Sequence, residues 1–295
     1  SMQAFVFGAQ QIQTGASDVV LVGGVESMSN VPYVMKNARW GLRMKHHEIT
    51  DALWEGLTDP LGGYMMGITA ENLAEKYTIT REEQDEVAYT SHMRAAAAQK
   101  AGLFDDEIVP VPVPQRRGDP KLISLDEHIR PDLTLEALAK MRPAFKPDGG
   151  TVTAGNSSGI NDGASAAVIM SADKAKELGL TPMARLLSHA AAGVEPELMG
   201  YGPVPSTRKA LARAGKTVQD VGLWEINEAF AAQYLAVEKL LELDRGITNV
   251  NGSGVALGHP VGCTGLRIII SLVYEMTRRD VKLGGASLCV GGGMG

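Results

Sequence analysis

The sequence predicts an α/β protein made of two similar halves, because the order helix, glycine, buried strand occurs near both ends of the chain. Residues 2–14 carry apolar side chains at helical spacing, Gly15 suits the left-handed position after a helix, and 18–22 are typical of a buried strand. Residues 264–279 again follow a helical pattern, and 282–290 contain two glycines and a short apolar strand. The alternation predicts the class, and the repeat is a sign of duplication without proving it.

A mostly helical segment is inserted within the first half. Strand signals thin out over 31–145, where methionines, charged residues and helix signals dominate. Thr80 and Glu83 have the spacing of a capping box at the start of a helix. Residues 109–121 contain four prolines and two arginines and are predicted to be a loop. The chain is therefore divided into a first half (1–30 and 146–178), the insert (31–145) and a second half (179–295).

After the insert, helices and strands alternate again. Each short helix is expected to end at a glycine in the left-handed conformation. The predicted elements are strands over 166–170 and 223–226, helices over 171–178 and 206–214 that end at Gly179 and Gly215, and a long helix that begins near Asn227.

The composition is that of an ordinary globular protein and excludes several function classes. Of the 295 residues, 44% are hydrophobic and 21% charged, and the net charge of -6 opposes binding to a nucleic-acid backbone. The longest apolar stretch, 268–274, is far shorter than the roughly 20 residues that cross a bilayer, and no signal peptide is visible. Cys263 and Cys289 are too few for a disulfide scaffold and fit a reducing compartment. We therefore expect a cytoplasmic protein without nucleic-acid or membrane partners.

One turn presents a histidine immediately before a helix, in residues 258–265 (GHPVGCTG). Its proline and glycines fix the turn and leave the imidazole of His259 free of helix packing. Such a histidine can activate a thiol or hydrogen-bond a thioester oxygen. Taken alone, a turn with a surface histidine explains the same residues. The pair His46 and His47 lacks a third nearby ligand, so no metal site is predicted.

A cysteine precedes a glycine run at the end of the last predicted strand, in residues 289–295 (CVGGGMG). A thiol that moves a proton to and from carbon must lie against the substrate, and glycines let backbone N–H groups approach closely enough to hold an oxyanion. A buried cysteine beside a flexible turn is the alternative. Gly291 and Gly292 match Gly23 and Gly24 as predicted exits of equivalent strands.

Two further segments lie at junctions between elements. Residues 224–230 (WEINEAF) place Asn227 where a helix cap is expected and Glu228 in the first helical turn, which accounts for both without a function. Residues 153–163 (TAGNSSGINDG) have the small side chains of a tight crossing between packed elements. They lack the spacing of a Walker or dinucleotide-binding loop.

Together these four segments resemble the thiolase family, in this order and at this separation, over nearly the whole chain. The runs at His259 and Cys289 resemble the family's two C-terminal signatures, and 227–230 its intermediate one. Residues 1–4 resemble those that follow the nucleophilic cysteine of the N-terminal signature, and that cysteine is not among these residues. The resemblance implies two duplicated α/β halves in α-β-α-β-α layers, an incomplete N-terminal half, and an insert that covers the coenzyme A (CoA) site.

The resemblance also implies a reaction of fatty acid metabolism, including β-oxidation. A thiolase cleaves 3-ketoacyl-CoA with CoA, or condenses acetyl-CoA in reverse, through an acyl-cysteine. His259 would activate the nucleophile and help to hold the thioester oxygen, and Asn227 would position a water in the same oxyanion hole. Cys289 would be the acid and base, and the N–H of Gly291 would serve a second oxyanion hole. CoA is a substrate, and no tightly bound cofactor is implied.

Seven residues are implied to line the channel for pantetheine and the acyl chain. Short-chain members often carry histidine where this chain has Met65, and a flexible apolar methionine favours longer acyl chains. Core filling is the alternative for Met65. The seven are Leu57, Met65 and Met66 from the insert, with Ala184, Ser188, Ala229 and Phe230 from elsewhere.

Two other functions are compatible with parts of the pattern. A decarboxylating ketoacyl synthase shares the fold but usually pairs its nucleophile with two histidines or with His and Asn, so Cys289 favours thiolase chemistry. A non-catalytic acyl-CoA-binding or scaffold protein is the other, because a polypeptide that begins at Ser1 lacks the nucleophile and is expected to be inactive. Family members are dimers or tetramers, so we expect a homodimer or homotetramer, with the Met-rich stretch 33–44 as a candidate interface.

Overall fold

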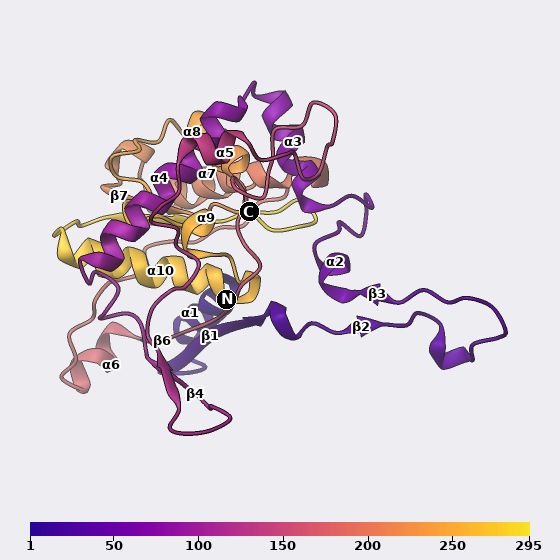
Figure 1. Ribbon diagram of the computed structural model, residues 1–295. Coiled ribbons are helices and arrows are strands. Elements are labelled where there is room, and N and C mark those ends of the chain that lie inside the picture. Colours follow the sequence, from indigo (N-terminus) through magenta and orange to yellow (C-terminus); the bar gives the residue numbers. More distant parts are fainter.

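The computed structural model describes all residues 1–295 (Figure 1). Its longer helices are α1 (Met2–Gln13), α3 (Met66–Lys76), α4 (Arg81–Lys100), α7 (Pro203–Ala214), α8 (Ala231–Leu241) and α10 (Val261–Arg278). The shorter ones are α2 (Ala52–Gly56), α5 (Leu135–Ala139), α6 (Ala172–Glu177) and α9 (Gly254–Leu257). The strands are β1 (Val19–Ser27), β2 (Tyr33–Val34), β3 (Thr50–Asp51), β4 (Val111–Val113), β5 (Lys121–Ile123), β6 (Asp162–Met170), β7 (Leu223–Ile226) and β8 (Gly284–Ser287).

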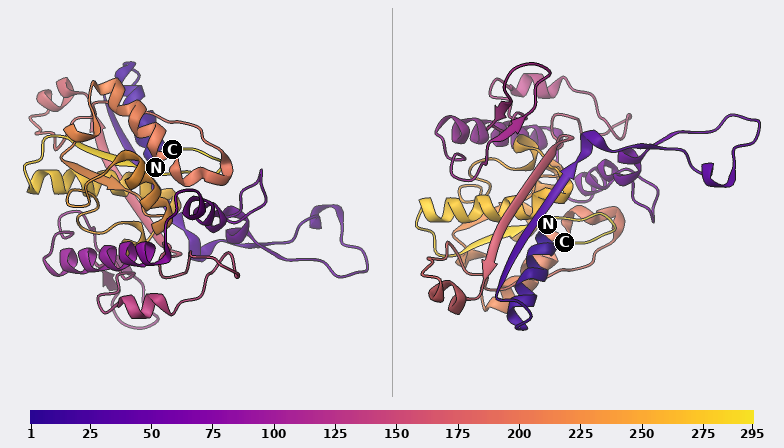
Figure 2. Two further views of the ribbon diagram at one scale, coloured as in Figure 1. Left: turned by 90° about the horizontal axis from the view of Figure 1, so that it is seen from above. Right: turned by 90° about the horizontal axis from the view of Figure 1, so that it is seen from below.

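Two strand pairs form the core sheets, one from each half. β1 pairs antiparallel with β6, from Val19 opposite Met170 to Ser27 opposite Asp162. β7 runs parallel to β8, which requires a crossover connection, and α10 lies within it. α10 packs against both sheets, and α1 packs against β1 and α10, so these two helices separate the sheets (Figures 1 and 2). On the other side of β7 and β8, α7 and α8 complete the layers.

The β1–β6 sheet is covered by helices on one face only. Successive side chains of a strand point to opposite faces, and Leu21 and Val25 of β1 are 73% and 70% exposed. The layers seen are therefore sheet, helices, sheet, helices, which are four of the five expected. The elements predicted around Gly15, Gly179 and Gly215 are confirmed, since each helix ends before a glycine of positive φ.

β1 is longer than the sequence predicts, and this corrects the role of its glycines. Because the strand continues to Ser27, Gly23 and Gly24 lie inside it and do not mark its exit. A Cβ at Gly24 would lie 2.3 Å from both the Gly262 carbonyl oxygen and Ser1 Cβ. The glycine is therefore required where the N-termini of α1 and α10 pack against the strand.

Helices are the main regular elements of the insert, although much of it is irregular, and the predicted capping box of Thr80 and Glu83 opens α4. Its first part, 33–51, projects from the body as an arm (Figures 1 and 2). The predicted loop 109–121 is wrong in part, because β4 and β5 form a short hairpin there with Pro112 opposite Leu122. An isolated pair has free edges, where a proline is tolerated. No helix in the chain is both long and apolar enough to cross a membrane.

Candidate active site

His259 lies on the turn between α9 and α10, and its backbone is held from the first half of the chain. The Asn161 side chain accepts a hydrogen bond from the His259 N–H at 3.2 Å. Gly258 has a φ of 94°, and a Cβ there would lie 2.5 Å from Asn161 Cγ. Only glycine allows this approach without strain. Asn161 was not among the predicted site residues, although it lies in the glycine-rich segment 153–163.

The hydrogen bonds of His259 assign its tautomer. Its Nδ1 lies 2.7 Å from Thr264 Oγ1, and that hydroxyl donates to the Pro260 carbonyl oxygen at 2.9 Å. A hydroxyl has one proton to donate, so Thr264 accepts from His259 Nδ1–H. The lone pair therefore resides on Nε2. Burial, with a smaller contribution from the Arg267 charge, lowers the pKa of His259 to about 4, so the ring is neutral near pH 7.

Asn227 is not a helix cap, which corrects the expectation from sequence. α8 begins at Ala231, after an N-cap residue, Phe230, whose side chain makes no capping bond. The Asn227 N–H donates to the Ser287 carbonyl oxygen at 3.0 Å, which extends the pairing of β7 with β8. Its side-chain Nδ2 lies 3.4 Å from His259 Nε2, and its Oδ1 is buried without a partner. The tertiary hydrogen bonds thus override the local preference for a cap.

Glu228 is also outside the helix and is fully enclosed. Its carboxylate accepts hydrogen bonds from Ser91 Oγ at 2.6 Å, Asn249 Nδ2 at 2.8 Å and the Val255 N–H at 3.3 Å. Burial raises its pKa despite these donors. The carboxylate connects the Asn227 loop to α4 and to α9, and α9 leads directly to His259.

Cys289 lies beyond the end of β8 in a small apolar cluster. It is 7% exposed and packs with Met199 and Ala229, against the partly buried Met66 and Phe230. Burial raises the pKa of its thiol to about 12. The thiol is therefore protonated near neutral pH and lies against apolar surface.

The glycine run after Cys289 forms a tight turn with two free donors. The N–H groups of Val290 and Met294 each donate to the other residue's carbonyl oxygen, at 2.9 and 3.1 Å. Gly292 and Gly293 adopt φ values of 81° and 87°, which glycine tolerates. The N–H groups of Gly291 and Gly293 make no hydrogen bond within the protein. Of the two, only the Gly291 N–H was expected to hold an oxyanion.

Five of the seven expected channel residues lie in two connected groups. Ala229 and Phe230 contact Cys289, as does Met66. Met66 donates its N–H to the Leu57 carbonyl oxygen at 2.9 Å, and Met65 Sδ accepts from Thr58 Oγ1 at 3.2 Å. Leu57, Met65 and Met66 therefore belong to one folded segment of the insert.

Segment 153–159, which had no predicted role, borders the same group. The Ser158 N–H donates to the Ala229 carbonyl oxygen at 3.0 Å, and Ser157 forms a bridge with Phe230. The small side chains that predicted a tight crossing are the only sequence signal for this placement.

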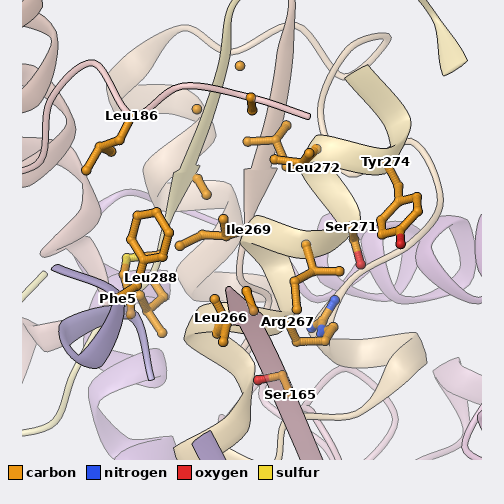
Figure 3. A pocket seen from close by; sticks show the side chains of 18 of the residues that line it. Phe5, Ser165, Leu186, Leu266, Arg267, Ile269, Ser271, Leu272, Tyr274 and Leu288 are labelled. Carbon is orange, nitrogen blue, oxygen red and sulfur yellow. The ribbon is translucent and has the colours of Figure 1, made fainter. Parts of the chain in front are cut away.

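Ala184 and Ser188 are not brought to this group. Ser188 Oγ donates to the Ala210 carbonyl oxygen of α7 at 2.7 Å. Both residues line a large open cavity of about 2940 Å³ between α1, β6 and α10, whose apolar wall is seen in Figure 3. None of the other nine predicted site residues lines that cavity. The largest open space is therefore not where the predicted site residues gather.

Cys263 and Cys289 are both free and buried. No three His, Cys, Asp or Glu side chains are grouped closely enough to hold a metal ion.

Comparison with known proteins places this chain in a family. The family models described as "Thiolase, N-terminal domain" and "Thiolase, C-terminal domain" match residues 1–173 and 180–295. The acetyl-CoA acetyltransferases of Chromobacterium violaceum and Cupriavidus necator are 55% and 53% identical over 295 residues, which is 100% of this chain and 75% of each relative.

Solved structures agree with the sequence comparison. The Bacillus anthracis acetyl-CoA acetyltransferase is 57% identical with a TM-score of 0.97, and it is matched over 99% of this chain and 74% of its own. Human mitochondrial 3-ketoacyl-CoA thiolase in complex with CoA is 48% identical with a TM-score of 0.95, over 99% of this chain and 73% of its own. The resemblance seen in the sequence is thereby confirmed, and the chain belongs to the thiolase family and has the thiolase fold.

Proposed function

We propose that these residues supply the acid–base and oxyanion-binding groups of a thiolase, which cleaves 3-ketoacyl-CoA with CoA or runs the reverse condensation of acetyl-CoA. One observation carries the proposal: residues 227–230 join the imidazole to the thiol. Asn227 contacts His259, and two residues later Ala229 packs against Cys289. Side chains from α9–α10 and from the end of β8 thus border one loop. The family relationship and the relatives' names support the same reaction.

The protonation states suit the two halves of the reaction. Neutral His259 has its lone pair on Nε2 and can take the proton of an attacking thiol. In cleavage, an acyl-cysteine forms while the bond between C2 and C3 breaks and the electron pair goes to the acetyl-CoA enolate. Cys289 then gives its proton to C2 of this enolate, which becomes acetyl-CoA. In condensation the Cys289 thiolate removes the same proton, and a raised pKa makes it the stronger base.

The oxyanions have distinct donors. The free Gly291 N–H can donate to the oxygen of the acylated cysteine. The unpartnered Asn227 Oδ1 can accept from a water that donates to the thioester oxygen of the enolate. Protonated His259 can donate to that same oxygen. Leu57, Met65, Met66, Ala229 and Phe230 would line the channel for pantetheine and the acyl chain.

Neither cysteine of this chain is suited to be the nucleophile. Burial raises the pKa of the thiol in both Cys263 and Cys289, so each is protonated near neutral pH. We therefore propose that a polypeptide limited to these 295 residues has no thiolytic turnover.

Two finer features of the function follow from the insert. Met65 offers a flexible apolar wall, so we propose that acyl chains longer than acetoacetyl are accepted. The arm carries Trp40 and Met44, which are highly exposed, and we propose that it contacts another copy in a homodimer or homotetramer. Light scattering of a Trp40→Ser, Met44→Ser variant tests the second point, and an unchanged mass would count against it.

The decisive experiment is a steady-state assay of the natural full-length polypeptide that contains residues 1–295. It should consume CoA and 3-ketoacyl-CoA of increasing chain length and release acetyl-CoA. A protein that instead decarboxylates malonyl thioesters, or that binds acyl-CoA without cleaving it, would contradict the proposal.

A further inference from the structure

A buried carboxylate of the insert reaches the glycine turn of the second half. Asp59 lies between α2 and α3 and is 1% exposed. Its Oδ1 accepts from the N–H groups of Leu61 and Gly62 at 2.9 and 2.8 Å, which caps its own turn. The backbone closes the same turn, since Asp59 donates to the Tyr64 carbonyl oxygen at 2.8 Å. Oδ1 alone is therefore sufficient to cap the turn of residues 59–64.

The other oxygen makes a distant contact. Asp59 Oδ2 accepts from the Gly292 N–H at 3.2 Å, across 233 positions of sequence. This is the only side-chain contact recorded for the N–H groups of Gly291, Gly292 and Gly293. Local capping explains Oδ1 but not Oδ2. Asp51 shows the difference, because it caps α2 through Oδ1 alone, at 2.8 Å from the Leu53 nitrogen.

The contact restrains a backbone that has few other restraints. The turn is held at its ends by Val290 and Met294, while Gly292 and Gly293 have positive φ and no side chain to limit rotation. The Gly292 nitrogen belongs to the peptide that follows Gly291. Fixing that peptide limits the rotation of Gly291 and hence the direction of its free N–H. A hydrogen bond to a buried carboxylate is also stronger than one between neutral groups.

We propose that Asp59 is a positioning residue for the oxyanion-binding N–H of Gly291, so that docking of the insert completes the second oxyanion hole. The inference rests on the proposed thiolase function. The segment that carries Asp59 also carries Leu57, Met65 and Met66, which are proposed to line the acyl channel. The Asp59 carboxylate therefore fixes the position of these residues relative to the glycine turn. Met66 Sδ lies 3.5 Å from the position that a Cβ on Gly291 would occupy.

The substitution Asp59→Asn separates the two roles of the carboxylate. The side-chain carbonyl oxygen of the variant can still accept hydrogen bonds from the N–H groups of Leu61 and Gly62. Its NH₂ group would then face the Gly292 N–H, and two donors cannot form a hydrogen bond with each other. We expect the single-turnover rate of enzyme acylation to fall at least about tenfold, because loss of an oxyanion donor costs about 10² to 10³. The equilibrium dissociation constant of CoA should stay within about twofold, since binding is not the step affected. Asp51→Asn is the matched control and should leave both values unchanged.

The outcomes separate this inference from the proposed function. Absence of CoA-dependent cleavage in the unsubstituted full-length protein rejects the function itself. An active wild type with normal acylation by Asp59→Asn, or an equal loss in Asp51→Asn, overturns the role of Asp59. A third measurement needs no variant and therefore does not depend on its folding. In the unsubstituted protein the Gly292 amide should exchange with deuterium at least about tenfold more slowly than that of Gly291, and equal rates overturn the inference.

Discussion

The imidazole Nδ1 of His259 and the hydroxyl of Thr264 lie 2.7 Å apart, and the hydroxyl is already committed as a donor to the Pro260 carbonyl oxygen. This relationship, between the turn before α10 and the first turn of that helix, determines which nitrogen of the histidine carries the proton. In many enzymes a carboxylate performs this task. Here a neutral group does so, and it adds no negative charge that would raise the pKa of the histidine.

Replacement of Thr264 by Val should remove the acceptor of His259 Nδ1–H and free the ring to change tautomer. We expect kcat to fall by about tenfold to a hundredfold, a part of the 10² to 10⁴ that a positioned acid–base group contributes. Thr264→Ser keeps the hydroxyl and should restore kcat to within about threefold of the wild type. Equal rates for the Val and Ser variants, measured on the full-length protein, would show that the hydroxyl has no role in orienting the ring.

Replacement of Cys289 by Ala should abolish both cleavage and condensation, because it removes the thiol that is proposed to give and take the proton at C2. Cys263→Ala is the matched control, since Cys263 is also a buried free thiol but lies outside the cluster around Cys289, and its variant should keep normal turnover. Deuterium incorporation at C2 of acetyl-CoA measures the proton transfer directly. A Cys289→Ala variant with full turnover would refute the assigned role.

Replacement of Glu228 by Ala should destabilise the fold and displace the catalytic loops. It would leave the Ser91 hydroxyl and one of the two N–H groups on Asn249 Nδ2 without a partner, at about 1 to 3 kcal/mol for each group. Glu127→Ala, on an exposed loop, should change the free energy of unfolding by less than about 0.5 kcal/mol. Urea denaturation compares the two, and similar midpoints would contradict the structural role of Glu228.

Glu225 should make the stability depend on pH in a direction opposite to that of a surface carboxylate. It is 4% exposed, its Oε2 has no partner, and burial raises its pKa to about 8. Between pH 4.5, the pKa of the unfolded state, and about pH 8, Glu225 is protonated in the folded state but ionised in the unfolded state. The stability that Glu225 contributes is therefore lost as the pH rises through that window.

The variant Glu225→Gln mimics the protonated carboxyl group and should remove this dependence. Relative to the wild type, its free energy of unfolding should increase with pH by at most about 1.4 kcal/mol for each pH unit between the two pKa values. Denaturation at pH 5 and at pH 9 tests the sign. A free-energy difference, variant minus wild type, that stays constant or falls as the pH rises would show that the pKa of Glu225 is not raised in the folded state.

Replacement of Met65 by His should narrow the range of substrates. A ring in place of the flexible thioether is expected to lower kcat/KM for longer 3-ketoacyl-CoA by about tenfold relative to acetoacetyl-CoA, the scale on which apolar pockets discriminate. Met44→His, on the projecting arm, should leave the ratio unchanged. A constant ratio in Met65→His would mean that Met65 does not border the acyl chain.

Local rules were sufficient for much of the fold. The helix over 2–14, the strand over 223–226 and the glycines that follow α6 and α7 were predictable because periodicity and backbone conformation depend on near neighbours. The family could also be identified, since the runs at His259 and Cys289 are specific in combination. The division into 1–30 with 146–178, 31–145 and 179–295 stays a prediction.

Local rules failed where distant segments meet. At Asn227 they predicted a cap, but pairing with Ser287 and the contact with His259 hold the residue outside the helix. Asp59 gives no signal in the sequence beyond a turn, because its second oxygen finds its partner only when the insert folds over the glycine turn. The amino-acid sequence by itself determined which chemical groups this protein has and the helices and strands that carry them. The tertiary structure alone decided which of those groups meet and which nitrogen or oxygen each one presents, because hydrogen bonds between segments far apart in the chain depend on packing and not on neighbouring residues.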